Sequence, residues 1–288
     1  MTRNPRLRGA PGLAALLLCA CGGAATPAPT PLVVSQQWAI TRLGINSEEA
    51  HDFAACEPGF ALVPSNGGVL LAGWNAWIIK PGEPRIASVA CDAHSRLYAI
   101  EDGKVVIESA SAPGTTGALT KGESRAIDPP AEADLPAGTW QVLSGAQGPV
   151  WLWGKLADSN DSSILRWEPP SRELEVVYSG AHPIRAASVI GTKGFAAVLD
   201  EDLVLWEDGH TPFRFGHVGA GIDGLAVDTE GDIFLSSGKG VVEMHADTNW
   251  SIVSAGVHGP LRMRDDVLYV LVHDPSIEIL RLTPTSDG

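Results

Sequence analysis

The chain has 288 residues, of which 44% are hydrophobic, and this is enough to build a sizeable core. Its formal net charge is −14, from 34 acidic against 20 Lys and Arg side chains. Nucleic acid and anionic lipid headgroups both need a basic surface, so this charge argues against either as the main partner.

The first twenty residues have the pattern of an export signal. Three arginines lie before an apolar segment at residues 10–20, which is too short to span a bilayer. The segment ends in Leu18-Cys19-Ala20-Cys21, which resembles the lipobox of bacterial lipoproteins. The resemblance implies cleavage before Cys21 and lipidation of its thiol. Cys19 is a weaker candidate because the bulky Leu18 precedes it, and an ordinary cleaved signal peptide without lipid is the alternative.

We therefore expect three parts along the chain: a lipoprotein signal peptide at 1–20, a Pro/Ala-rich tether at 21–31, and a folded domain at 32–288. Gly22, rather than Asp, follows Cys21. By analogy with such lipoproteins, this favours a bacterial outer-membrane location, on the periplasmic or the surface face. The membrane would be contacted by the lipid anchor only.

Two further cysteines lie in the folded part, Cys56 and Cys91. Export would place them in an oxidising compartment, so a disulfide between them is expected. The alternative is a pair of buried thiols packed as small apolar groups.

A hairpin pattern recurs along the rest of the chain: an apolar strand, a turn with Gly or polar residues, and a second apolar strand. It occurs at 68–81, 96–109, 149–168, 194–208, 232–245 and 267–282. Equivalent positions in the last four hairpins are Trp167, Trp206, Met244 and Leu282, spaced by about 40 residues. The stretch 112–138 lacks strand periodicity and predicts a long loop.

A repeat of about 40 residues made only of short strands predicts an all-β fold, a β-propeller of six blades. A β-sandwich also alternates short strands and turns, but a regular repeat makes it the weaker interpretation. Only six residues follow Leu282, too few for an outer strand. We therefore predict that the segment 32–44, which has strand character, supplies the outer strand that closes the last blade.

The stretch GIDGLAVDTEGDIFL at 221–235 resembles the blade motif of NHL-repeat and gluconolactonase-like propellers, and 88–100 is a degraded copy. The resemblance implies a divalent metal near the central channel, held by Glu, Asn and Asp. Here Asp223 matches the family's Asp, Gln147 stands where the family has Glu, and 183–195 lacks the expected Asn-Gly. Because only one of the three expected ligand positions matches, we expect no metal, no other cofactor and no catalytic set.

Tryptophan is abundant, with nine residues. Trp74, Trp77 and Trp140 lie near predicted turns and are candidate binding aromatics for glycans or proteins. Trp167 and Trp206, at equivalent repeat positions, are expected to fill the space between blades.

These observations favour a lipid-anchored propeller of the cell envelope that acts as a non-catalytic binding or assembly scaffold, with a protein or glycan partner. The alternatives are a metal-dependent lactonase or related hydrolase, suggested by Asp223, and a carbohydrate- or peptidoglycan-binding propeller, suggested by the tryptophans.

Overall fold

The computed structural model describes residues 38–44, 50–56, 59–64, 69–72, 86–94, 96–108, 131–144, 148–191, 194–207, 210–245, 250–273 and 277–285. All of them belong to the unit Val33–Gly288. Every regular element in these ranges is a β-strand, as the turn-rich hairpin pattern predicted. No helix with the length and hydropathy of a membrane span occurs in them.

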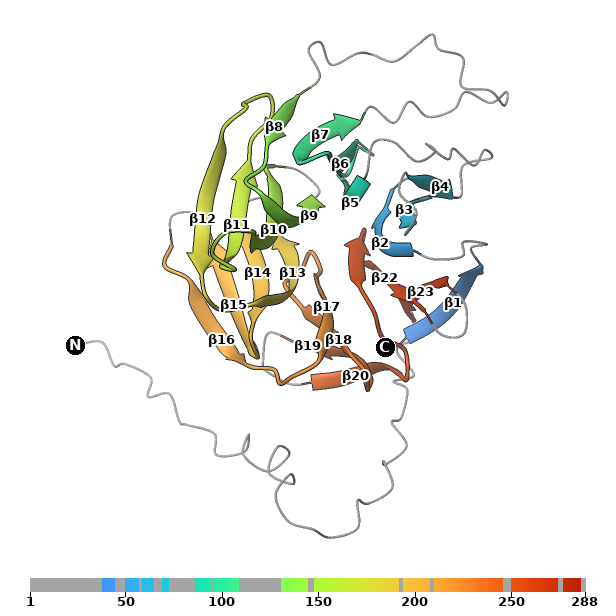
Figure 1. Cartoon of the computed structure of the whole chain (residues 1–288). Coiled ribbons are helices and arrows are strands. Elements are labelled where there is room, and N and C mark those ends of the chain that lie inside the picture. Colours follow the sequence, from blue (N-terminus) through green and yellow to red (C-terminus); the bar gives the residue numbers. More distant parts are fainter. Residues whose placement is uncertain are drawn as a thin grey trace, which may run out of the picture. The chain divides into compact units, whose positions relative to one another are not determined.

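Five sheets have four strands each, in up-and-down order (Figure 1). Three of them are contiguous in the middle of the chain. They comprise β9 (Gly138–Ser144), β10 (Val150–Leu156), β11 (Ser162–Trp167) and β12 (Leu174–Gly180); then β13 (Ile184–Ile190), β14 (Gly194–Leu199), β15 (Asp202–Glu207) and β16 (Phe213–His217); then β17 (Ile222–Val227), β18 (Ile233–Ser237), β19 (Gly240–Met244) and β20 (Trp250–Ala255).

Two further sheets also have four strands. One is built from consecutive strands, and the other contains both ends of the described chain. The first comprises β5 (Ile86–Cys91), β6 (Leu97–Glu101), β7 (Lys104–Glu108) and β8 (Glu132–Asp134); the second comprises β21 (Leu261–Arg264), β22 (Val267–Val272), β23 (Glu278–Pro284) and β1 (Trp38–Gly44). A sixth sheet has three described strands, β2 (Ala50–Ala55), β3 (Phe60–Pro64) and β4 (Leu70–Ala72).

The all-β propeller is therefore confirmed, but the prediction of six complete blades is corrected: the described residues form five four-stranded blades and one three-stranded sheet. The hairpin expected at 68–81 is the source of the difference. Its first strand, β4, is the third strand of its sheet rather than the second, and residues 73–85 lie outside the described residues. The sequence pattern missed β2 and β3; in β2, His51 and Asp52 interrupt the apolar character of the strand.

A second correction concerns the loop expected at 112–138. Residues 132–134 form β8, which pairs antiparallel with β7, and β9 begins at Gly138. A three-residue edge strand is too short to show a period of two, so no alternation of apolar and polar residues marks it in the sequence. Residues 109–130 lie outside the described residues.

The N-terminal closing strand is confirmed for the described part of its segment. Strand β1 pairs antiparallel with β23 along its whole length, from Trp38 opposite Pro284 to Gly44 opposite Glu278. The first and last described strands are thus joined by main-chain hydrogen bonds, which satisfies the outer edge of the last sheet.

Apolar side chains between neighbouring sheets form the core. Trp167 and Trp206 are buried, with 0% and 5% exposure, as the repeat predicted. Trp167 packs in a cluster shared by the sheets β5–β8 and β9–β12, and Trp206 in one shared by β9–β12 and β13–β16. Each sheet buries its faces against its neighbours, which is why no single repeat could be stable alone.

The Asp turn of the recognised motif occurs in both copies. Asp92 accepts the backbone N–H groups of His94 and Arg96, and Asp228 accepts those of Glu230 and Asp232. A carboxylate that bonds residues two and four positions ahead fixes the tight turn between the first two strands of a blade. The motif is therefore a turn signal, and its presence says nothing by itself about catalysis.

Candidate functional site

The six first strands of the sheets, β2, β5, β9, β13, β17 and β21, line the centre of the propeller, and each contacts the next around the ring. Their carboxyl ends surround a cavity of about 180 Å³, lined among others by Ala55, Ser144 and Val227. The amino ends of four of them, together with nearby turns, surround a second cavity of about 740 Å³. The propeller thus has two openings with different chemistry.

A buried ion pair joins the first and last sheets in the interior. The guanidinium of Arg262, on β21, donates through Nη2 to Oδ1 of Asp52, on β2, at 2.6 Å, and through Nε to the carbonyl of Phe53 at 3.0 Å. Oδ2 of Asp52 accepts the Ser88 hydroxyl at 2.5 Å and the Val89 N–H at 3.2 Å. This carboxylate is fully satisfied by protein groups, so its evident role is to hold neighbouring blades in register.

The smaller opening, at the carboxyl ends, is lined by Asp92, Asp228 and Arg264 among others. Burial raises the pKa of Asp228, although the hydrogen bonds of its turn oppose this. Next to Asp92, Tyr98 is 2% exposed, and burial followed by the charge of Asp92 raises its pKa to about 12. These acidic groups are committed to turns and to Tyr98, so this opening offers little for catalysis.

The larger cavity, at the amino ends, is lined by His51, Trp140, Trp153 and Lys155 among others. Its volume lies within the range of small-molecule sites, about 300–1,000 Å³. It combines aromatic walls with groups able to donate hydrogen bonds, a pattern that suits a small ligand carrying both apolar surface and oxygen atoms.

The candidate metal ligand Asp223 lies at the amino end of β17, at the same end of the central strands as this cavity. Its Oδ2 is 2.9 Å from Nδ1 of His258, which precedes β21, and the two side chains are 39% and 50% exposed. Gly224 makes this meeting possible: a Cβ there would overlap the carbonyl oxygen of Gly259 and lie 2.7 Å from Cγ of Leu261. The Asp-Gly pair thus brings β17 close to the segment that carries His258.

Of the other predicted lipidation, metal and aromatic site residues, the structure describes Trp140 but not the remaining four. Cys21, Trp74, Trp77 and Gln147 lie outside the described residues. Trp140 is 5% exposed and donates its indole N–H to the carbonyl oxygen of Pro136 at 2.7 Å. It is therefore a buried residue in the wall of the larger cavity, and its role as a binding aromatic stays a prediction.

Cys56 and Cys91 form a disulfide, with an S–S distance of 1.96 Å and Cα atoms 5.5 Å apart. It joins the residue that follows β2 to the end of β5, and so links two adjacent sheets covalently at the smaller opening.

Sequence reasoning missed His258, Arg262 and Asp52. Each lies at or near the start of a central strand, but the partners are separated by 35 residues for Asp223–His258 and 210 for Asp52–Arg262. The repeat itself could have indicated these pairs, because residues at equivalent positions of successive blades lie at the same end of the channel.

No family model and no curated protein matches the chain. Solved structures show the fold. A gluconolactonase from Xanthomonas campestris superposes with a TM-score of 0.60 at 17% identity, over 85% of this chain and 89% of that one. A luciferin-regenerating enzyme superposes with a TM-score of 0.58 at 12% identity, over 86% and 96%. These superpositions show that the chain has the β-propeller fold of these enzymes, at an identity that carries no activity with it.

Proposed function

We propose that the protein is a hydrolase of a small lactone or a related ester, acting at the opening formed by the amino ends of the central strands. The observation that supports this most is the Asp223–His258 pair, found at that opening in a fold shared with a gluconolactonase. A cavity of about 740 Å³ at the same end of the strands gives room for a small ligand, although neither Asp223 nor His258 is among the residues that line it.

The chemistry follows from the geometry of the pair. When Nδ1–H of His258 donates to Asp223, the lone pair of the imidazole lies on Nε2. Nε2 can then take a proton from a water molecule as that water attacks the substrate carbonyl, and it can return the proton to the leaving alkoxide. Asp223 holds the ring in the required tautomer and stabilises the imidazolium that forms.

The divalent metal of gluconolactonase-like propellers does not fit the donors described here. Among the described residues, the only His, Cys, Asp or Glu group that converges as a metal site does not include Asp223. The carboxylate of Asp223 is already engaged by His258, and Gln147 lies outside the described residues. We therefore derive no step through a metal at this opening.

A second candidate function is the non-catalytic binding scaffold that the sequence favoured. It is supported by the structural roles of other acidic residues near the channel. The carboxylate of Asp52 is fully engaged in joining blades, and Asp228 stabilises a turn between strands. In this case the larger cavity would bind a ligand, or a protein or glycan partner, without converting it. The carbohydrate-binding version would use Trp140 and Trp153, which line that cavity.

For the cellular location, we propose that the protein is an envelope lipoprotein anchored through Cys21 to the bacterial outer membrane. It is supported by the lipobox-like residues that end at Cys21. The test is the Cys21→Ser variant, which should leave the membrane fraction or remain unprocessed. A variant of normal mature size that still partitions with membranes would refute the anchor.

The experiment for the activity is a panel of aliphatic and sugar lactones and aryl esters, assayed with the wild type, His258→Ala and Asp223→Asn. We expect turnover that falls about 10²–10⁴-fold in His258→Ala, because a positioned base contributes about that factor. His94→Ala is the matched control, since this exposed histidine lies in the β5–β6 turn at the opposite end. Turnover unaffected by both site variants would refute the role of the pair, and no turnover in the wild type would favour the scaffold.

A further inference from the structure

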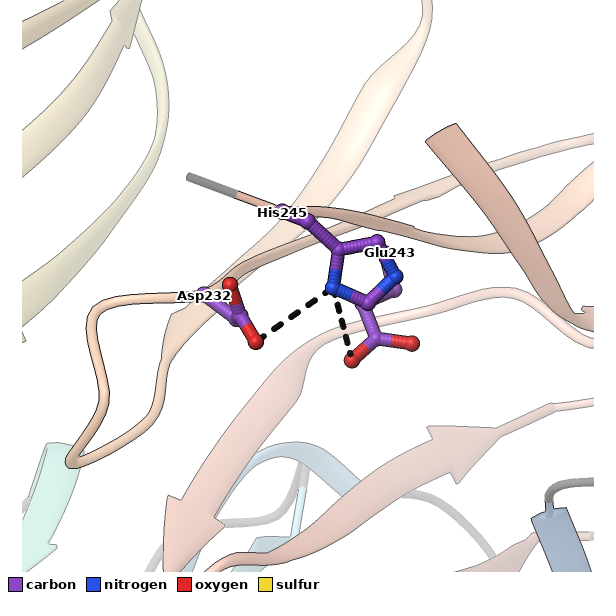
Figure 2. Close-up of side chains that lie close together, drawn as sticks. All are labelled: Asp232, Glu243 and His245. Atoms are coloured by element: carbon purple, nitrogen blue, oxygen red, sulfur yellow. Dashed lines mark hydrogen bonds and ion pairs between the residues drawn. The ribbon is translucent and has the colours of Figure 1, made fainter. Parts of the chain in front are cut away.

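Three side chains of one blade converge on a point away from the central channel. Asp232 precedes β18, Glu243 lies on β19, and His245 follows β19 (Figure 2). One ligand atom from each lies within 4.8 Å of the others, and both carboxylates face the same ring nitrogen, Nδ1 of His245.

Both carboxylates lie farther from Nδ1 than is usual for a charged hydrogen bond, although the contact with Asp232 is still within hydrogen-bond range. Nδ1 is 3.4 Å from Oδ2 of Asp232 and 3.7 Å from Oε1 of Glu243. A hydrogen bond between a charged nitrogen and a carboxylate is normally about 2.7–2.9 Å. Two ligands that each lie about 2.1 Å from a tetrahedral metal are separated by about 3.4 Å.

Other histidines of the chain provide a comparison. His182 with Asp200 and His258 with Asp223 are two-residue pairs, and their distances are 2.7 and 2.9 Å. His217 also has two acidic neighbours, but Glu201 approaches its Nε2 and Asp202 its Nδ1, so the two carboxylates do not converge on one nitrogen.

The carboxylate of Glu243 is held so that one oxygen faces the cluster. Glu243 is 7% exposed, and its Oε2 accepts the Ser251 hydroxyl at 3.0 Å and the indole N–H of Trp38 at 3.4 Å. Oε1 is the atom near His245. Partners of this kind, which hold a ligand through its second atom, are typical of metal sites in proteins.

Asp232 is held by its backbone. Its N–H donates to Oδ1 of Asp228 at 2.8 Å, and its carbonyl accepts the N–H of Asp228 at 3.1 Å. The turn that the motif encodes thus fixes the position of the first carboxylate, and the strand β19 fixes the other two residues.

Among the residues that the structure describes, no neighbouring Lys or Arg balances the charge of the cluster, since none forms an ion pair with Asp232 or Glu243. Two carboxylates, one of them buried, therefore share a single imidazole. A divalent cation would neutralise both and remove the repulsion between them.

We propose that Asp232, Glu243 and His245 bind a divalent transition metal, with Zn²⁺ as the best match for one imidazole and two carboxylate ligands in tetrahedral geometry, and a water as the fourth ligand. The site is structural. It is linked through Glu243 to Trp38 on the closing strand β1, so the metal stabilises the contact between the blade β17–β20 and the strand that closes the propeller. This site is independent of the catalysis proposed at the central opening.

The test uses the mature protein freed of metal with a chelator. Zn²⁺ is titrated calorimetrically, and Mg²⁺ and Ca²⁺ are titrated in parallel. We expect one Zn²⁺ per chain, with at least tenfold weaker binding of Mg²⁺ and Ca²⁺, and a rise in the melting temperature when Zn²⁺ is bound. Substituted Co²⁺ should give the intense visible absorption of a tetrahedral site.

Asp232→Asn and His245→Asn should each weaken Zn²⁺ binding by at least tenfold, and Ser251→Ala by about 10–100-fold, the range for a lost second-sphere partner. Asp200→Asn, which alters a simple His–Asp pair, is the matched control and should bind as the wild type does. If a ligand variant fails to fold, the Co²⁺ spectrum and the Zn²⁺ stoichiometry of the wild type still test whether the site binds a metal. The proposal is overturned if the wild type shows no saturable one-to-one Zn²⁺ binding, or if folded Asp232→Asn and His245→Asn bind as the wild type does.

Discussion

Replacing Arg262 with Met tests the buried ion pair that joins the first and last sheets. The side chains of Arg262 and Asp52 are 15% and 5% exposed, so the substitution leaves a buried carboxylate without its countercharge. Removing one partner of a buried pair costs about 3–5 kcal/mol. The N–H groups of Phe53 and Val89 and the hydroxyl of Ser88 still donate to Asp52, which places the expected loss near the lower end, at about 3 kcal/mol.

Arg262→Lys separates the charge from the geometry. The ammonium keeps the positive charge but cannot also donate to the carbonyl oxygens of Phe53 and Leu261, as the guanidinium does. Two lost hydrogen bonds at about 0.5–1.5 kcal/mol each predict a loss of about 1–3 kcal/mol. The order of stability should therefore be wild type, Arg262→Lys, Arg262→Met.

The assay is equilibrium urea unfolding of the disulfide-bonded protein, followed by far-UV circular dichroism and tryptophan fluorescence. Coincident transitions are required before free energies are compared. Asp52→Asn and the double variant complete a double-mutant cycle, in which we expect a coupling energy of about 1–3 kcal/mol. The reasoning is refuted if Arg262→Met costs less than about 1 kcal/mol, or if the coupling energy falls within about 0.5 kcal/mol of zero.

Three further predictions concern the fold. Gly224→Ala should lose about 1–3 kcal/mol in a urea titration through overlap with Gly259, while Gly216→Ala, whose Cβ would meet nothing within 4 Å, should not; equal losses in both would contradict the contact. Reducing the disulfide Cys56–Cys91 should cost about 3–4 kcal/mol for its 35-residue separation, and thiol labelling of the unreduced, unfolded protein would show that the bond is absent. Since the pKa of Tyr98 is raised to about 12 in the folded state from 10.0, stability should fall by about 2 kcal/mol between pH 10 and 12; a Tyr98→Phe variant with the same loss would disprove the assignment.

The sign of the Tyr98 prediction follows from proton binding. Between pH 10 and 12 the folded phenol keeps its proton while the unfolded phenol loses it, so the unfolded state binds fewer protons and stability decreases as the pH rises. Below about pH 9 both states are protonated, and this residue adds no pH dependence there.

The hairpin pattern predicted the second and third strands of five sheets from the sequence alone. It did so because these strands are apolar on both faces and are joined by short turns, as in Leu97–Glu101 and Lys104–Glu108. It failed for Glu132–Asp134, because that strand is a short, polar edge strand. A run of apolar residues identifies a strand that is buried on both faces, but strands at the edge of a sheet lack such a run.

The closing strand shows what a simple count of elements can achieve. The prediction that a segment before the first hairpin covers the outer edge of the last one is confirmed by the pairing of Trp38 with Pro284. That inference needed no coordinates, because an unpaired edge is unfavourable wherever it occurs.

The sequence by itself determined the all-β class, the repeat, the buried tryptophans and the turn aspartates, because each depends on residues close together in the chain. Only the tertiary structure decided the strand count of the first sheet, the burial of Trp140, and the pairing of Asp223 with His258 and of Glu243 with Trp38. Those contacts join residues 35 and 205 positions apart. Their distances are set by how the sheets pack around the channel, a property of the whole ring that no local pattern of residues contains.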